Sequence, residues 1–250
     1  MAEKYLLKNH GNIKTLIWRP SIIACALKDP FPAWTDSISA AGGLCILWLM
    51  GAMPFMYTET GENALDMIPV DVVTNGLLVA TSHSAQAKQM LHIYNSATSA
   101  ENPLSFNKFK GIGLYRARYF HLNKRMFKDD LYFKFIHTKW EYDMRIKLQM
   151  KLPLKALNVA ANTPVVGTKN LKKQAEKMNK LAKKGEGLND LYAFFIDGNW
   201  KFENKKITKL IDMLSPEEKV EFGCDIRNLD WDKFVLYYAH GMAIWCLNED

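Results

Sequence analysis

Apolar runs separated by short polar breaks dominate the first hundred residues, and this pattern predicts strands that alternate with helices. The stretch Thr15–Trp34 begins as a β-branched and apolar run, breaks at Arg19 and Pro20, resumes, and ends in a proline-rich loop at 29–32. An apolar run of this kind, here 14–23, is typical of a strand buried on both faces of a parallel sheet. Because open α/β sheets bind ligands beyond the carboxyl ends of their strands, we expect a ligand near this loop.

The neighbouring segments continue the alternation. Residues 2–10 are predicted to form the last turns of a helix, and 91–95 a short strand. Helices are predicted over 72–83 and from 103 to about 111, the first of them N-capped by the carboxylate of Asp71. The alternation of strand and helix is typical of an α/β domain.

The segment 37–58 contains no charged residue, and its centre, 44–50, is strongly apolar. Its length reaches what a membrane-spanning helix needs. Three glycines and Pro54 interrupt it, and the apolar centre is much shorter than a span. We interpret the segment as buried or facing a partner, with membrane contact and a transmembrane helix as the alternatives.

The chain changes character after about residue 115. Residues 115–157 are rich in aromatic and basic side chains at helical spacing, and Lys169–Lys184 holds seven lysines and one glutamate. A solvated amphipathic helix is the first interpretation of Lys169–Lys184, and binding to an anionic lipid surface is the second. Nucleic acid is disfavoured as a partner because no recognised fold signature accompanies the basic residues. The apolar face of the predicted helix consists of Leu171, Ala175, Met178 and Leu181.

The last fifty residues carry clear helix signals. Ser215 and Glu218 form a predicted capping box around Pro216 at the first helical position. A further helix is predicted over 231–247. Its aromatic side chains are expected to lie in a core or an interface.

Composition narrows the class of partner. The net charge of +7 favours an anionic partner, such as a phosphorylated cofactor, an acidic protein or an acidic membrane. The four cysteines are scattered, so we expect free thiols and an intracellular, reducing compartment. Because the predicted helix at 2–10 leads directly into a strand that needs a parallel neighbour, we expect an upstream part of the fold to be supplied from outside this chain.

The sequence contains none of the common local signatures of catalysis. There is no glycine-rich phosphate loop and no nucleophile elbow, and the histidines are isolated. Gly111-Ile112-Gly113 lacks the third glycine and is interpreted as a turn. The residues alone therefore indicate an incomplete α/β unit, a basic helical part, no metal site and no self-contained active site.

Two sets of motifs resemble the fatty acyl-CoA reductases, which are extended short-chain dehydrogenases with a C-terminal helical sterile domain. The resemblance implies an α/β fold: the C-terminal part of an incomplete Rossmann-like reductase domain over 1–114, followed by a mainly helical sterile-type domain over 115–250. The first set comprises WRPSII at 18–23, KDPFPAWTD at 28–36, 68–73 and 94–95, and the second comprises 200–204, 214–219, 225–231 and Gly241.

The resemblance implies NADPH-dependent reduction of a long-chain acyl-CoA, through an aldehyde, to a fatty alcohol. It places Pro20, Ser21 and Ile22 beside the nicotinamide, and Phe31 and Trp34 along the acyl chain. The glycine-rich loop and the Tyr-x-x-x-Lys pair of the family lie N-terminal to all of these motifs. We therefore assign no catalytic residue, expect the chain to be inactive alone, and expect another polypeptide to supply or replace the missing half.

One departure from the family favours a second hypothesis. Where the family has a basic, polar stretch, this chain has the apolar residues 47–52. The alternative function is a non-catalytic structural subunit of a membrane-bound complex. Mitochondrial, endoplasmic reticulum and peroxisomal membranes are the candidate locations, with 37–58 or 169–184 as the membrane-contacting segments.

Overall fold

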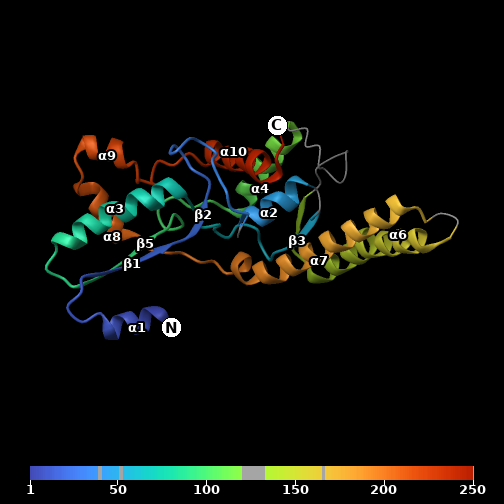
Figure 1. Ribbon diagram of the computed structural model, residues 1–250, viewed down its shortest axis with the longest axis horizontal. Coiled ribbons are helices and arrows are strands. Elements are labelled where there is room, and N and C mark those ends of the chain that lie inside the picture. The colour runs from blue at the N-terminus through green and yellow to red at the C-terminus, as the bar shows by residue number, and fades with distance from the viewer. Residues whose placement is uncertain (39–40, 51–52, 120–132, 165–166, 250) are drawn as a thin grey trace.

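The computed structural model describes residues 1–38, 41–50, 53–119, 133–164 and 167–249 of an elongated molecule (Figure 1). The N-terminal half contains α1 (Ala2–Asn9), β1 (Thr15–Pro20), β2 (Ile22–Ala24), α2 (Ala41–Leu49), β3 (Phe55–Tyr57), β4 (Met67–Pro69), α3 (Val70–Gln86), β5 (Leu91–Ser96) and α4 (Phe106–Tyr119). The C-terminal half contains β6 (Lys134–Ile136), α5 (Lys139–Arg145), the π-helix η1 (Ile146–Lys151), α6 (Leu152–Asn162), α7 (Lys169–Asp197), α8 (Lys205–Met213), α9 (Pro216–Phe222), α10 (Trp231–Gly241) and the π-helix η2 (Met242–Cys246).

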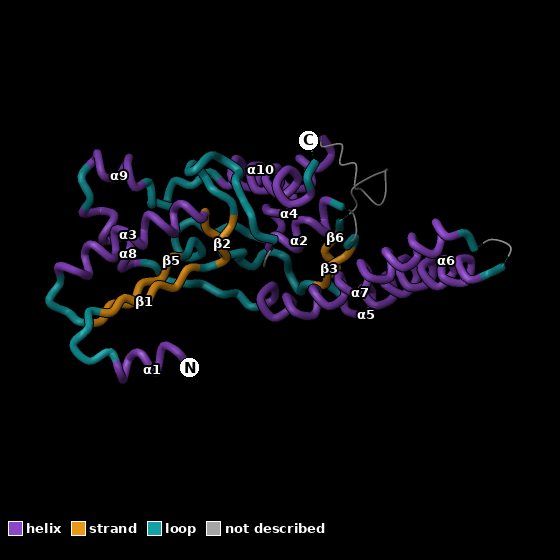
Figure 2. Tube along the Cα trace, viewed as in Figure 1, coloured by secondary structure: helices purple, strands orange, loops and turns teal. Residues whose placement is uncertain are grey.

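The described strands form three parallel pairs, which Figure 2 shows in orange. β1 pairs with β5 from Thr15 opposite Leu91 to Pro20 opposite Ser96, β2 pairs with β4, and β3 pairs with β6. Parallel pairing between strands separated by helices is the expected signature of an α/β fold. The prediction of an incomplete Rossmann-like part followed by mainly helical structure is confirmed.

The expectation that β1 is buried on both faces is wrong. Ile17 is the one fully buried residue of this strand, and the other five residues keep some contact with solvent. Among the described strands β1 pairs only with β5, so it lies at the edge of its sheet. Leu16 and Trp18 pack in one hydrophobic cluster with residues of α3 and α8. Within the described chain, pairing with β5 alone therefore leaves β1 partly exposed.

Helix α2 lies in the main hydrophobic core. Seven of its nine residues are buried, including Leu44 and Trp48. The indole ring of Trp48 lies with its centroid 4.3 Å from that of Phe133 and 5.6 Å from that of Phe109. The interpretation of this apolar segment as buried is confirmed for Ala41–Leu49. Among the described residues, no helix combines the length and hydrophobicity needed to cross a bilayer.

Helix α4 differs from its prediction at both ends. It begins at Phe106 and extends to Tyr119, so Gly111 and Gly113 lie inside a helix and the predicted turn is wrong. Glycine weakens a helix by roughly 1 kcal/mol relative to alanine, a small cost that tertiary packing overrides. Here α4 packs against α10 and α2.

The predicted amphipathic helix is confirmed and extends further than predicted, as α7. Its seven lysines up to Lys184 are exposed, and Ala175 is buried. Helix α6 packs along α7, and the two form the extended hairpin at the right of Figure 1. The side-chain amides of Asn158 and Asn179 hydrogen bond to each other across this hairpin, with an N–O distance of 2.8 Å for the shorter bond.

The C-terminal helix signals are also confirmed. The hydroxyl of Ser215 accepts a hydrogen bond from the Glu218 amide at 3.2 Å, and the Glu218 carboxylate accepts one from the Ser215 amide at 2.8 Å. The predicted helix at 231–247 consists of α10 and η2. Of the four aromatic residues expected in a core or an interface, Phe234 and Tyr238 lie in the main core, Tyr237 packs against it, and Trp245 is 48% exposed.

Candidate functional site

An open, largely apolar cavity of about 390 Å³ lies at the junction of β1 and β2. Ser21 and Ile22 line it at this junction, and Asp66 lines it just before β4. Segments far away in the sequence complete the wall. These are the end of α7 and the loop that follows it, which contribute Phe194, Phe195, Trp200 and Phe202.

Ser21 lines this cavity and has a fixed backbone. Its amide donates to the carbonyl oxygen of Ser96 at 2.9 Å, and the amide of Ile22 donates to that of Asp66 at 3.2 Å, which fixes the backbone between β1 and β2. The Ser21 hydroxyl oxygen is buried and has no hydrogen-bond partner among the described residues. An unpaired buried hydroxyl is costly, so a change of the Ser21 rotamer towards a polar partner would be favourable.

The carboxylate of Asp66 organises the loop that follows β5. It accepts hydrogen bonds from the amide of Thr98 at 2.8 Å, from the Thr98 hydroxyl at 3.1 Å and from the amide of Ser99 at 3.2 Å. Asp66 is buried, so these three donors compensate the cost of removing its charge from water. The carboxylate therefore holds the loop.

The same loop anchors the segment that carries the aromatic wall. The Ser99 hydroxyl accepts from the amide of Phe202 at 2.9 Å, and the side-chain amide of Asn204 donates to the carbonyl oxygen of Ala97 at 2.9 Å. The side-chain amide of Asn95 donates to the carbonyl oxygen of Glu203, also at 2.9 Å. The motifs at 94–95 and 200–204 therefore meet at the carboxyl end of β5.

Asn102 connects the next motif to the same region. Its side-chain amide donates to the carbonyl oxygens of Ile226 at 2.9 Å and Leu229 at 3.0 Å. Its side-chain oxygen accepts from the indole nitrogen of Trp231 at 2.9 Å. Sequence reasoning did not single out Asp66, Ser99 or Asn102. The available signal was the cluster of Ser, Thr and Asn just after a predicted parallel strand.

The loop containing Phe31 and Trp34 lies outside the cavity lined by Ser21 and packs on η2. The ring of Phe31 lies with its centroid 5.5 Å from that of Trp245 in η2. Neither Phe31 nor Trp34 belongs to the lining of the cavity at Ser21. Their contact with an acyl chain stays a prediction, as does the position of Pro20, Ser21 and Ile22 beside a nicotinamide.

Asp71 has a different role from the predicted N-cap. Helix α3 begins at Val70, with Pro69 as its N-cap residue and no side-chain cap. The Asp71 carboxylate instead accepts from the amides of Leu27 at 3.0 Å, Lys28 at 2.8 Å and Asp29 at 3.1 Å. The helix starts one residue before Asp71, and the carboxylate is taken by amides of the loop after β2. The carboxylate therefore fixes this loop.

The cysteines are free thiols, as predicted. Burial raises the pKa of the Cys25 thiol and raises that of Cys45 to about 12, so neither is a nucleophile at neutral pH. Among the described residues, no group of His, Cys, Asp or Glu side chains converges as a metal site.

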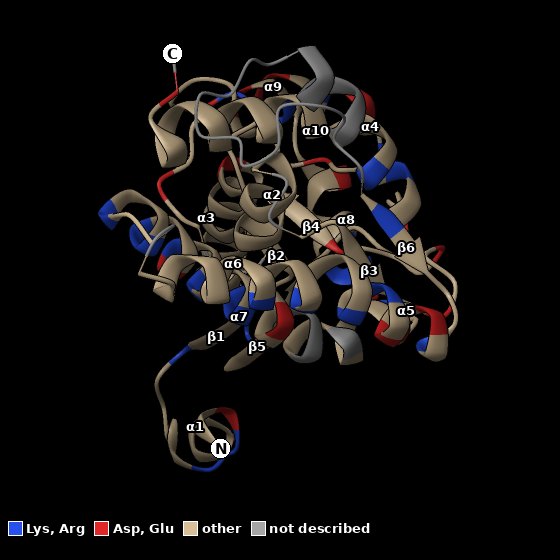
Figure 3. Cartoon of the chain, turned by 90° about the vertical axis from the view of Figure 1, so that its right-hand side faces the viewer, with Lys and Arg blue, Asp and Glu red and all other residues tan. Residues whose placement is uncertain are grey.

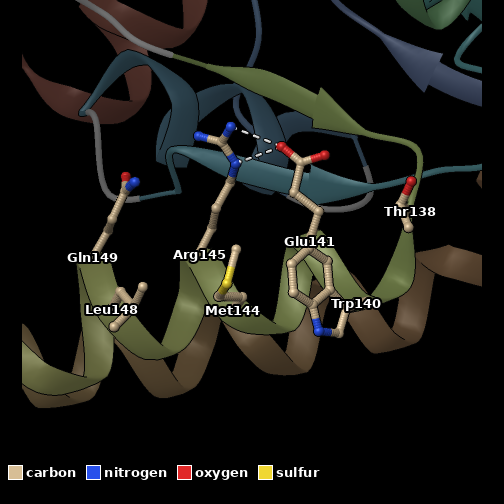
Figure 4. A pocket seen from close by; sticks show the side chains of 7 residues that line it. All are labelled: Thr138, Trp140, Glu141, Met144, Arg145, Leu148 and Gln149. Carbon is tan, nitrogen blue, oxygen red and sulfur yellow. Dashed lines mark hydrogen bonds and ion pairs between the residues drawn. The ribbon is translucent and has the colours of Figure 1, made fainter.

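A second depression, of about 500 Å³, lies along α5 and η1 (Figure 4). Arg145 and Glu141 form an ion pair at 2.7 Å beside it. The guanidinium carbon of Arg145 also lies 5.7 Å from the centroid of the Phe55 ring in β3. Trp140, Met144 and Leu148 extend from the helix on the side away from α7.

Two family models, both described as male sterility protein, match residues 1–77 and 150–249, and together they cover more than half of the chain. The model of the NAD-binding part matches the first region, and the sterile model matches the second. The chain is 27% identical over 254 residues to fatty acyl-CoA reductase 1 of Rattus norvegicus and 26% identical over 251 residues to that of Gallus gallus. It is 24% identical over 251 residues to fatty acyl-CoA reductase wat of Drosophila melanogaster.

The chain belongs to the male sterility protein family and is a relative of the fatty acyl-CoA reductases. These alignments cover all of the chain and 46–47% of each relative, so the chain spans about half the length of the curated relatives it matches. Ser21 and Asp66 lie in the region matched by the NAD-binding model, and the aromatic wall at 194–202 lies in the region matched by the sterile model. The cavity is thus formed between the two matched parts of this fatty acyl-CoA reductase relative.

Proposed function

We propose that this chain binds the acyl group of a long-chain acyl-CoA in an NADPH-dependent fatty acyl-CoA reduction. The observation that carries the proposal is the cavity shared by Ser21 and Ile22 with Phe194, Phe195 and Trp200. Its lining is mainly apolar, and its volume lies within the range of roughly 300–1,000 Å³ that is typical of small-ligand sites. A long acyl chain gains about 0.8 kcal/mol for each methylene that such a surface removes from water.

The Ser21 hydroxyl supports cofactor binding at the same place. It is a buried donor without a partner among the described residues, at the end of the strand where a nicotinamide is expected. Bound NADPH would supply the hydride that reduces the thioester carbonyl. Ser21 would hold a polar group of the cofactor or substrate, and the aromatic side chains would orient the acyl chain and exclude water.

The chemical step requires groups from elsewhere. The sequence has no glycine-rich dinucleotide loop, and none of its tyrosines is followed four positions later by lysine. We therefore expect turnover only when another polypeptide segment supplies a proton donor and the phosphate-binding loop. Binding of the acyl chain and turnover are separable properties of this protein.

Palmitoyl-CoA tests the proposal directly. Binding of palmitoyl-CoA should quench the tryptophan fluorescence of the purified chain. Free CoA should not displace palmitoyl-CoA from it. Phe195→Ser should weaken binding at least tenfold, because it places a polar side chain in the acyl wall. Val220→Ser makes the same kind of apolar-to-polar change at an exposed position on α9, and it should leave binding unchanged.

Two results would overturn parts of this proposal. Oxidation of NADPH by the isolated chain in the presence of palmitoyl-CoA would show that no additional segment is needed. Equal affinity of wild type and Phe195→Ser for palmitoyl-CoA would exclude the cavity as the acyl site.

The alternative function is that of a non-catalytic structural subunit in a membrane-bound complex, mitochondrial or other. The net charge of +7, which suits an anionic partner, favours it. Burial of Ala41–Leu49 in the chain's own core gives that apolar segment a partner within the chain, which weakens one motive for this alternative. Stoichiometric recovery in a large complex, with no binding of NADPH or palmitoyl-CoA by that complex, would favour the structural role.

A further inference from the structure

A straight line of exposed hydrophobic side chains follows the helix formed by α5, η1 and α6. Trp140, Met144, Leu148 and Leu152 recur every four residues, and they are 70%, 37%, 53% and 50% exposed. Figure 4 shows that Trp140, Met144 and Leu148 extend from the same side of the helix. We call these four residues the apolar stripe. Large apolar side chains that are contiguous and exposed mark interaction surfaces more often than isolated ones do.

The π-helical segment keeps the apolar stripe straight. In an α-helix of 3.6 residues per turn, a four-residue spacing drifts around the axis by about 40° per step. Residues Ile146–Lys151 form a π-helix, whose turns contain more residues, so the drift is reduced where the stripe passes through it. Trp140 and Leu152, twelve residues apart, can therefore face the same plane.

The opposite side of this helix is already used for packing. Tyr142 and Ile146 are buried in a cluster with Phe55 and Ile136 of β3 and β6, and α6 packs on α7. The apolar stripe is thus a second hydrophobic face, in addition to the one that joins the hairpin to the body of the molecule. The hairpin projects from one end of the molecule (Figure 1), so a flat surface can approach it.

Exposed lysines accompany the apolar stripe along its own helix, and further exposed lysines lie on the neighbouring helix α7. Lys147, Lys151 and Lys155 alternate with its members along η1 and α6. Lys151 pairs with Glu186 at 3.1 Å, and the seven lysines of Lys169–Lys184 are exposed on α7. Figure 3, which looks at this end of the molecule, shows the basic positions on α6 and α7 in blue. Long lysine side chains can cover apolar surface while their ammonium groups reach a charged layer.

We propose that the apolar stripe and its flanking lysines dock the hairpin onto an anionic lipid bilayer, with the helix lying in the plane of the interface. An amphipathic helix with an aromatic and aliphatic face and a lysine-rich flank is the arrangement that binds such interfaces. Each lysine near an anionic surface strengthens the attraction to that surface. A second copy of this chain would bring the same positive charge to the stripe, so charge favours lipid over self-association. This inference does not depend on the proposed reductase function.

Vesicle flotation with the full chain tests this inference. Vesicles of phosphatidylcholine with 30% phosphatidylserine should bind the protein, and pure phosphatidylcholine should bind it at least tenfold more weakly. The double variant Trp140→Ser, Leu148→Ser should lose at least tenfold in affinity, and Lys147→Gln with Lys155→Gln should weaken binding and its salt dependence. The control pair Met213→Ser, Val220→Ser changes equally exposed apolar residues on α8 and α9 and should have no effect.

Circular dichroism of every variant should match that of the wild type, because all of these side chains are exposed. Absence of binding by the wild type to anionic vesicles would overturn the inference. Equal binding by the Trp140→Ser, Leu148→Ser variant would also overturn it. A concentration-dependent dimer that this double variant abolishes would assign the apolar stripe to self-association instead.

Discussion

Gly241 of α10 lies against the carbonyl oxygen of Ala33 so closely that a methyl group on Gly241 would overlap this oxygen. Ala33 has a left-handed backbone conformation, with φ of 72°. It belongs to the loop after β2, which Asp71 holds from the other side through three amide hydrogen bonds. Helix α10 and the start of α3 therefore both contact the loop after β2. Through this contact the part of the chain that resembles a sterile domain fixes a loop of the α/β part.

Replacing Gly241 with alanine is expected to destabilise the protein by about 1–3 kcal/mol, because the added methyl group must displace backbone rather than a flexible side chain. Urea unfolding followed by circular dichroism measures this change. Gly187→Ala is the control. Gly187 lies in the exposed part of α7 with open space around its Cα, and alanine there should stabilise the helix by up to about 1 kcal/mol. Identical midpoints for Gly241→Ala and wild type would contradict the close contact.

The loop after β2 should also depend on the charge of Asp71. Asp71→Asn replaces one acceptor oxygen with an NH2 group that faces amide donors, and we expect a loss of about 2–3 kcal/mol. Asp232→Asn is the matched control, because Asp232 is exposed and its ion pair with Lys108 lies at the surface. A midpoint shift no larger than that of the control would show that the three amides find other partners.

The fold was largely predictable from local patterns. The apolar runs predicted the strands near 15–24 and 91–96, and the Ser215 capping box predicted the start of α9. These features depend on residues adjacent in sequence, so a single sequence is enough to predict them. The prediction failed at Gly111 and Gly113, where packing of α4 against α10 and α2 outweighs the weak helix propensity of glycine.

The candidate site was only partly predictable. The resemblance to the reductase family singled out Ser21 and Ile22 as neighbours of a nicotinamide, which stays a prediction, and both residues line the cavity. The aromatic wall could not be identified, because Phe194 and Phe195 reach the cavity only through contacts between segments about 170 residues apart. The carboxylate of Asp71 was assigned to its own helix because a capping role is local, whereas its true partners lie more than forty residues earlier.

The stability of the protein should show an acid-side step that depends on Arg227. Hydrogen bonds from the Arg227 side chain, and its charge, lower the pKa of the Asp225 carboxyl below its usual value. The unfolded chain then binds the proton at a higher pH than the folded chain does. The stabilisation is therefore present at neutral pH and is lost as the pH falls below about 4 towards the folded-state pKa.

Arg227→Gln removes this stabilisation, so its unfolding midpoint should lie below that of wild type at pH 7, and the difference should shrink as the pH falls below about 4. Lys205→Gln removes the same charge from an exposed ion pair with Glu203 and should show no such step. A difference between Arg227→Gln and wild type that is constant from neutral to acid pH would exclude the proposed linkage.

The buried thiols should resist alkylation in the folded protein. Since the thiolate is the reactive form, a pKa of about 12 leaves roughly one Cys45 side chain in 10,000 ionised at pH 8. Iodoacetamide followed by mass spectrometry should modify the partly exposed Cys246 first, and Cys25 and Cys45 only after unfolding. In 6 M guanidinium chloride all four cysteines should react at similar rates. Fast modification of Cys45 under native conditions would mean that α2 opens readily.

Asn102 and Trp231 should be energetically coupled across the two parts of the chain. Asn102→Ala removes two donated hydrogen bonds and the side-chain acceptor of the Trp231 indole, while the backbone carbonyl of Asn102 stays as a second acceptor at 3.1 Å. We expect a loss of about 1–3 kcal/mol. Trp231→Phe removes the same indole donor, so in a double-mutant cycle the two losses should be less than additive by at least about 0.5 kcal/mol. Asn199→Ala, at an exposed position, is the control. Its loss of stability should add to that of Trp231→Phe. Strict additivity for Asn102 and Trp231 would show that the backbone carbonyl of Asn102 alone satisfies the indole and that the side-chain contact adds no coupling.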